Sequence, residues 1–197
     1  MNSDISRIID SKANEFQEMG KRGKEEIFGE LCFCLLTANT SAEMGIRTQN
    51  LIGLEGFITY DQNFLSEELK RIKYRFYNVR SNFIVQARWI IDELPGLLRS
   101  NKRDEVREYL VENVKGIGYK EASHFLRNVG IFNFAILDKH IMRMLSEEYK
   151  FQVPKAVLRK DYYKNEKIVA ALSEKVSLEP GIFDLYMWKI ATGKIIK

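Results

Sequence analysis

Apolar residues recur at intervals of three and four positions along most of the chain, which is the spacing of helices with one buried face. The strict alternation of apolar and polar residues that is typical of a half-buried strand is absent. The apolar stripes comprise Ile5, Ile8, Ile9 and Phe16; Ile27, Leu31, Cys34, Leu35 and Ala38; Ala87, Ile90, Ile91 and Leu94; Val106, Leu110 and Val114; Ala122, Phe125, Leu126 and Val129; and Ile141, Leu145 and Tyr149. With a last helix predicted roughly from Phe183 to Ala191, the pattern predicts an all-α fold.

Glycine and proline mark where these helices are expected to end. Pro95 and Gly96 should stop the helix that reaches Leu94. Gly116 should end the helix over 106–114, and Gly130 the helix over 122–129. Residues 53–63 and 151–154 lack the helical pattern, and we predict that they are connections.

Length and composition indicate a globular protein. The chain has 197 residues, 45% of them hydrophobic, which is enough for one domain or two small lobes that share a core. No apolar run approaches the ~18 residues of a membrane span, and residues 1–10 lack the layout of a signal peptide. We therefore expect a cytoplasmic protein without a membrane segment. The net charge of +4 permits nucleic-acid binding without requiring it.

The only two cysteines, Cys32 and Cys34, lie within an apolar helical stretch. On a helix they point to different faces, so we expect small core residues rather than a disulfide. Two cysteines are too few for a four-cysteine iron–sulfur cluster or zinc site, and we expect neither.

The most specific local pattern runs from Val111 to Leu126. One apolar helix closes, Gly116-Ile-Gly118 makes a tight turn, and a second helix begins at once. The glycines leave room for a phosphate to approach the backbone amides that open the second helix. With Ala122 at the helix crossing, the pattern resembles the helix-hairpin-helix motif of DNA-binding proteins. An ordinary glycine-bridged helix pair is the alternative.

Two residues suggest chemistry beside this hairpin. Lys120 lies at the mouth of the turn, and Asp138 lies eighteen residues further along, in front of an apolar helix that it should cap. A lysine amine attacks only in its neutral form, and a nearby carboxylate could orient or deprotonate it. A solvated surface lysine and a simple helix cap are the alternatives.

Residues 102–144, which contain this pair, resemble the helix-hairpin-helix DNA glycosylase superfamily. The resemblance implies a two-lobed helical fold, with lobes at 27–135 and at 1–26 plus 136–197 and the active site in the cleft between them. It also implies that Lys120 attacks the sugar C1′ of a flipped nucleotide. Departure of the base leaves a Schiff base, β-elimination then nicks the strand, and Asp138 stabilises the charge on the sugar.

Two further segments resemble one branch, the archaeal-type 8-oxoguanine DNA glycosylases. They are residues 75–80 and the ending from 183 to 197. The resemblance implies that Phe76 and Trp188 stack on the oxidised base and that the terminal carboxylate of Lys197 contacts the guanine edge. Core packing is the alternative for both aromatic residues.

Other residues are candidates for contacts with the DNA backbone or helix. The stretch from Leu69 to Arg80 has five basic residues and no acidic one, and Arg75 and Arg80 are its candidate contacts, although a solvated basic face has the same composition. Asn39 resembles a residue inserted where the base leaves, and a helix-terminal Asn is its alternative. His140 resembles a phosphate-contacting histidine, with a structural role as its alternative.

The leading hypothesis is a bifunctional 8-oxoguanine glycosylase and AP lyase that acts on double-stranded DNA. An endonuclease III-like glycosylase for oxidised pyrimidines and a non-catalytic helix-hairpin-helix DNA-binding module are the alternatives. The Schiff-base chemistry requires no cofactor, although the hairpin carbonyls could hold a cation. We expect a monomer.

Overall fold

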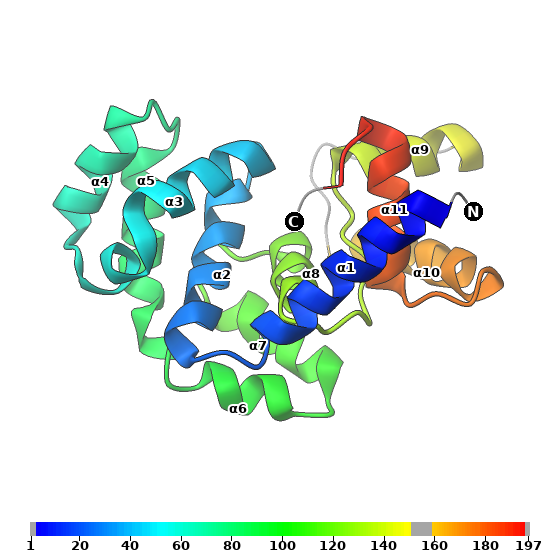
Figure 1. Cartoon of the computed structure of the whole chain (residues 1–197), viewed down its shortest axis with the longest axis horizontal. Helices are drawn as coiled ribbons and strands as arrows, with labels where there is room; N and C mark the ends of the chain where they lie inside the picture. Colours follow the sequence, from blue (N-terminus) through cyan, green and yellow to red (C-terminus); the bar gives the residue numbers. More distant parts are fainter. Residues whose placement is uncertain (1–2, 151–158, 196–197) are drawn as a thin grey trace. The chain divides into compact units, whose positions relative to one another are not determined.

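The computed structural model describes residues 3–150 and 159–195, and every regular element in these ranges is a helix (Figure 1). The helices are α1 (Ser3–Met19), α2 (Lys24–Thr37), α3 (Ala42–Thr59), α4 (Gln62–Arg71), α5 (Tyr77–Ala87), the 3-10 turn η1 (Arg88–Ile90), α6 (Leu94–Arg99), α7 (Arg103–Asn113), α8 (Tyr119–Asn128), α9 (Lys139–Tyr149), α10 (Arg159–Lys175) and α11 (Pro180–Thr192). The prediction of an all-α fold is confirmed. No helix in the described ranges has the length and apolar character needed to cross a membrane.

The chain divides into two compact units. One unit runs from Met19 to Phe125, and the other combines residues 1–18 with 126–197. The observed boundaries therefore lie at the end of α1 and within α8, whereas the predicted lobes changed at residues 27 and 136. The apolar pattern of residues 122–129 continues through the second boundary and contains no signal for it, whereas the first boundary is followed by a polar stretch at residues 20–26.

In the unit from Met19 to Phe125, α2 forms the centre. Every residue from Ile27 to Thr37 is buried, and α3, α5 and α6 pack against this helix. Helix α4 packs in turn against α3 and α5. Cys32 and Cys34 are both buried and free, so the prediction that they are core residues is confirmed.

Two predictions of local structure in this unit are wrong. The predicted connection over 53–63 is mostly helical, because Gly53, with φ of +68°, only kinks α3 and Asp61 caps the start of α4 through the Phe64 amide. The helix predicted to end at Pro95 instead breaks at Ala87, and Pro95 lies in the first turn of α6. Proline is tolerated there, since the first helical amides have no acceptor within the helix.

In the other unit, the core includes Ile9 and Phe16 of α1, Leu185 of α11 and Phe132. Helices α9 and α10 each pack against α11. The predicted stripe on α1 is confirmed except at Ile8, which is 52% exposed. The predicted connection at 151–154 lies outside the described residues.

Candidate active site

A tight turn joins α7 to α8 at the predicted hairpin. The Ile117 amide donates to the Val114 carbonyl at 3.1 Å, and the Ala122 amide donates to the Gly118 carbonyl at 2.8 Å as α8 begins. Gly116 has φ of +92°, which favours glycine, whereas Gly118 has no such angle. Only the first glycine is therefore required by the backbone conformation of the turn.

The side chain of Phe83 gives Gly116 a second reason to be glycine. A β-carbon at Gly116 would lie 2.2 Å from Cδ2 of Phe83, which reaches the turn from α5. At Gly118 a β-carbon would meet only the end of the Glu121 side chain, at 3.2 Å. The surface at Gly118 is thus the more open of the two for an approaching ligand.

Lys120 lies in the first turn of α8 with its side chain 26% exposed. Its Nζ is 3.5 Å from Oε1 of Glu121, whose side chain is also largely buried. Lys120 is therefore not a fully solvated surface lysine. The carboxylate of Glu121 was not anticipated from the sequence, where adjacent residues on a helix are not expected to face each other.

Asp138 is the N-cap of α9, as predicted. Its Oδ1 accepts hydrogen bonds from the amides of His140 and Ile141, both at 2.9 Å. These bonds satisfy two of the amides that a helix leaves free at its start. Both bonds are made to Oδ1, so the cap itself does not use Oδ2.

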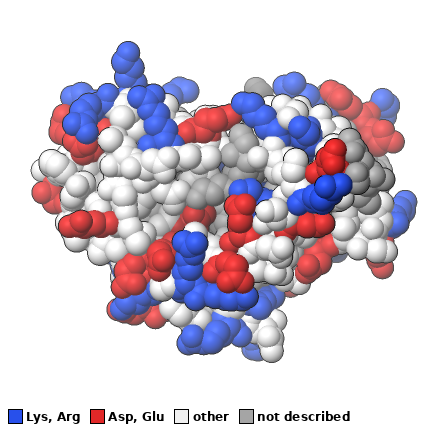
Figure 2. Space-filling view, in the orientation of Figure 1, with Lys and Arg blue, Asp and Glu red and all other residues white. Residues whose placement is uncertain are grey.

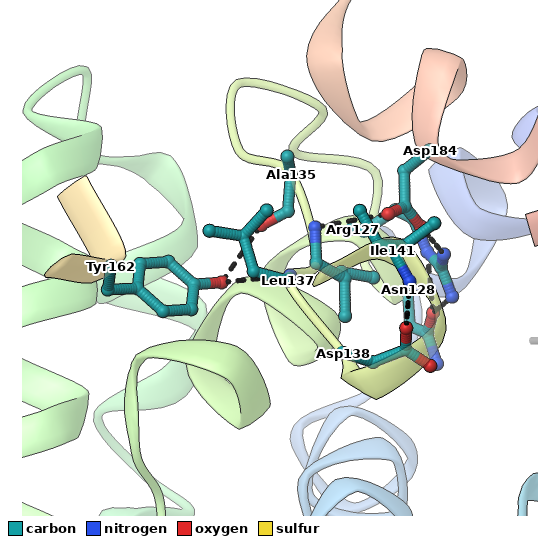
Figure 3. A network of polar contacts seen from close by, with 9 residues as sticks. Arg127, Asn128, Ala135, Leu137, Asp138, Ile141, Tyr162 and Asp184 are labelled. Atoms are coloured by element: carbon teal, nitrogen blue, oxygen red, sulfur yellow. Dashed lines mark hydrogen bonds and ion pairs between the residues drawn. The ribbon is translucent and has the colours of Figure 1, made fainter. Parts of the chain in front are cut away.

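A buried polar network lies directly before Asp138 (Figure 3). Arg127 of α8 and Asp184 of α11 form an ion pair with Nη1 and Oδ2 2.8 Å apart, and their side chains are only 5% and 4% exposed. Oδ1 of Asp184 accepts from the Ile136 amide at 3.2 Å. Tyr162 of α10 donates its hydroxyl to the Ala135 carbonyl at 3.0 Å. Sequence patterns had not singled out Arg127, Tyr162 or Asp184.

Burial raises the pKa of Asp184 from 3.8 to about 7. The Arg127 guanidinium opposes this shift, while the negative charge of Asp138 adds to it. The value shows that the cost of removing the carboxylate from water exceeds the attraction of its cation.

Trp188 is half-buried on α11, and its ring meets the ring of His140 edge to face, with centroids 5.2 Å apart. His140 thus has a packing partner, and its predicted phosphate contact stays a prediction. Lys197 lies outside the described residues.

Phe76 is half-buried at the start of α5, between two cations. The guanidinium of Arg75 lies 5.0 Å from its ring centroid, and that of Arg80 lies 5.8 Å away. Arg75 is exposed, as a DNA contact requires.

Arg80 is a buried residue. It is only 7% exposed, lies 5.5 Å from the Phe83 ring centroid, and donates to the Ala38 carbonyl at 2.9 Å. Its guanidinium thus lies within the protein on the buried side of α5, which excludes a solvated position for this arginine. The predicted DNA contact of Arg80 stays a prediction.

Asn39 is exposed in the turn after α2, with φ of +61°. Two side chains hold the neighbouring carbonyls, because Arg80 binds Ala38 and the Tyr74 hydroxyl binds Leu36 at 2.5 Å. Left-handed Asn after a helix is a common structural ending. Its exposure on a fixed turn is also compatible with insertion into DNA, which stays a prediction.

The rest of the basic stretch is less positive than its sequence suggested. Lys70 and Arg71 pair with Glu67 and Glu68, one helical turn earlier on α4. Figure 2 accordingly shows basic and acidic side chains mixed in the region of α4. Among the described residues, no group of three or more His, Cys, Asp or Glu side chains could hold a metal ion. A cation at the hairpin carbonyls stays a prediction.

A glycine turn that leads into a lysine-bearing helix, among the helices of the described residues, is the arrangement of the helix-hairpin-helix motif of DNA-binding proteins. Comparison with known families specifies the class further. The profile of the 8-oxoguanine DNA glycosylase family matches residues 9–178, and the chain belongs to this family.

Individual relatives match nearly the whole chain. A protein of Thermoplasma acidophilum named 8-oxoguanine DNA glycosylase/AP lyase is 53% identical, over 98% of this chain and 93% of the relative. The crystal structure of the Methanocaldococcus jannaschii 8-oxoguanine glycosylase/lyase in complex with 15mer DNA containing 8-oxoguanine matches with a TM-score of 0.95 and 45% identity, covering 100% of this chain and 95% of that one. The 8-oxoguanine DNA glycosylase of Thermotoga maritima matches with a TM-score of 0.93 and 40% identity, covering 98% and 93%.

The hairpin geometry predicts unequal effects of alanine at its two glycines. Gly116→Ala should lower the free energy of unfolding by about 2 kcal/mol or more, because it combines an unfavourable φ with overlap on Phe83. Gly118→Ala is the control and should cost less than about 1 kcal/mol. Urea unfolding of both variants measures the difference, and equal losses would contradict this geometry.

The raised pKa of Asp184 predicts a pH-dependent stability. Between pH 3.8 and about 7 the folded protein keeps a proton on Asp184 that the unfolded chain has lost. The protonated Asp184 therefore makes its full contribution to the free energy of unfolding below pH 3.8. This contribution is lost as the pH rises through about 7. The free energy of unfolding of the wild type minus that of Asp184→Asn should fall by up to about 1.4 kcal/mol per pH unit over this range. Urea unfolding across the range measures it, and a constant or rising difference would contradict the shift.

Proposed function

We propose that this protein excises 8-oxoguanine from DNA and nicks the strand at the resulting abasic site. The observation that carries the proposal is family membership over nearly the whole chain, together with a partly buried lysine at the opening of the hairpin's second helix. Relatives named AP lyases imply β-elimination chemistry, and an amine nucleophile that forms a Schiff base provides such chemistry.

Lys120 is the proposed nucleophile. Its amine attacks C1′ of the flipped nucleotide, the C1′–N9 bond breaks, and the base departs with a proton. The sugar then opens to an imine on Lys120, loss of a C2′ proton expels the 3′ phosphate, and hydrolysis of the imine releases the enzyme. Glu121, 3.5 Å from Nζ, keeps the amine oriented in the resting protein and can accept a proton from it.

Asp138 is the proposed carboxylate partner. Its two cap hydrogen bonds use Oδ1 and fix the orientation of the carboxylate before substrate binds. A fixed negative charge stabilises the positive charge that develops on the sugar as the base leaves. It does so without reorganisation during the reaction.

Phe76, Trp188 and Lys197 are the proposed base-recognition residues. Aromatic faces stack on a flipped purine, and the edge contact with His140 orients the indole of Trp188. The terminal carboxylate of Lys197 suits the N1–H and amino donors of the guanine edge.

The DNA itself is bound by the hairpin and by scattered polar groups. Gly116 and Gly118 bring the opening amides of α8 to a phosphate, while Arg75 and His140 contact the backbone. Asn39 fills the gap that the flipped base leaves. Arg80 supports Phe76 and the Asn39 turn from within the protein. All proposed site residues come from one chain and the chemistry needs no cofactor, so we propose a monomeric enzyme without one.

Borohydride trapping tests the nucleophile. Borohydride reduces an imine to a stable amine, so wild type on an 8-oxoguanine duplex should yield a covalent protein–DNA adduct. Lys120→Gln should form none and should excise the base about 1,000-fold more slowly or worse. Lys139→Gln, at an exposed lysine beside Asp138, is the control and should trap normally. Trapping by Lys120→Gln would refute the mechanism. Preference for a thymine-glycol duplex would instead favour a pyrimidine-specific glycosylase.

Removal of Lys197 tests base recognition. The shortened protein should excise 8-oxoguanine about 10-fold more slowly or worse, because its new terminal carboxylate, on Ile196, comes one residue earlier than the proposed acceptor. Cleavage at a preformed abasic site has no base to recognise and should change little. Rates on both duplexes measure the contrast, and equal losses would indicate a folding defect rather than recognition.

A further inference from the structure

The non-helical segment from Ala135 to Leu137 leads into Asp138, and side chains from other elements bind its backbone (Figure 3). The Tyr162 hydroxyl lies 3.0 Å from the Ala135 carbonyl and 3.4 Å from the Leu137 amide, so it can donate to one and accept from the other. The Ile136 amide between them donates to Asp184. Three consecutive residues are therefore held by two side chains.

Asp184 is itself held on its second oxygen. Arg127 binds Oδ2, and the same guanidinium also donates to Oδ1 of Asn128 at 3.2 Å and packs over the Phe16 ring. Each oxygen of Asp184 thus faces one donor, Arg127 or Ile136. The group is oriented from both sides, which restricts the position of the Ile136 amide.

We propose that Arg127, Tyr162 and Asp184, here called the Asp138 clamp, are positioning residues for the proposed chemistry. The clamp acts through the backbone of residues 135–137 and sets where the Asp138 carboxylate lies. This inference rests on the proposed function, because it assigns the clamp no role apart from Asp138.

The composition of the clamp favours positioning over simple stability. Burying an ion pair costs desolvation free energy, and apolar residues of similar volume often stabilise a core as well or better. Residues 135–137, however, lie outside any helix. The Ile136 carbonyl accepts from the Asp138 amide at 2.9 Å, and buried side chains bind the Ala135 carbonyl and the amides of Ile136 and Leu137. Small displacements of a catalytic group are costly, since a shift of about 1 Å can slow a reaction 100-fold.

The clamp is separable from base recognition. Trp188 lies on α11 with Asp184, yet it is proposed to contact only the damaged base. A preformed abasic site needs Asp138 but has no base for Trp188. Clamp variants should therefore slow cleavage of both an 8-oxoguanine duplex and an abasic duplex, whereas Trp188→Ala should slow the first more.

Tyr162→Phe is the first test, since it removes one hydroxyl and keeps the ring. Single-turnover rates should fall about 10-fold on both duplexes, while DNA affinity and the fraction of enzyme that can be trapped change less than about 2-fold. Tyr186→Phe on α11, which removes a hydroxyl away from the segment, is the matched control and should match wild type. A wild-type single-turnover rate for Tyr162→Phe would overturn the proposal. So would a lower activity that is fully explained by a smaller fraction of trappable enzyme.

The double variant Arg127→Met with Asp184→Leu separates position from stability. Apolar replacement removes the cost of burying two charges but leaves one buried amide unpaired, so the melting temperature should fall only modestly. It cannot restore an acceptor for the Ile136 amide, so the single-turnover rate should stay about 10- to 100-fold low. Recovery of the rate together with the melting temperature would show that the pair acts only in folding, and would overturn the proposal.

Asp138→Asn, assayed beside these variants, distinguishes a failure of the clamp proposal from a failure of the proposed role of Asp138. If Asp138→Asn reacts slowly while the clamp variants react normally, the clamp proposal fails and the proposed function stands. If Asp138→Asn itself reacts at the wild-type rate, the role of Asp138 fails and the clamp proposal fails with it.

Discussion

The buried ion pair between Arg127 and Asp184 is the interaction on which the arrangement around Asp138 depends. It joins α8 to α11 and fixes the acceptor for the Ile136 amide, directly before the cap of α9. Burial raises the pKa of Asp184 to about 7, so the protein keeps this carboxylate at a cost in free energy. Such a cost is tolerated where orientation is needed, and the residue that it orients is the proposed partner of the nucleophile.

Helix α8 contains both the proposed nucleophile and the arginine of the ion pair. Its first turn bears Lys120 after a turn that only glycine can make at Gly116, and its last turn bears Arg127. Every residue from Ala122 to Val129 is buried, so the helix is surrounded by protein rather than lying on a surface. The first turn of the helix, which bears Lys120, is by contrast only partly buried.

The sequence predicted the helices, the hairpin and the cap at Asp138 because each depends on local spacing. It misplaced the break near Pro95, since proline both ends helices and starts them. It contained no signal for the burial of Arg80 and did not single out Arg127 or Asp184, because a charge within an apolar pattern does not reveal whether a partner is buried beside it. Those partners are 57 residues apart, and only the tertiary fold brings them together. The family resemblance, not the spacing, pointed to Trp188 and Lys197.

Identification of the residue that carries the trapped DNA would show directly whether Lys120 is the nucleophile. After borohydride reduction on an 8-oxoguanine duplex, nuclease and protease digestion would leave a sugar remnant on one peptide, which mass spectrometry can locate. We expect the remnant on Lys120, within the peptide that opens α8. A remnant on another lysine, or on the N-terminal amine, would contradict this expectation.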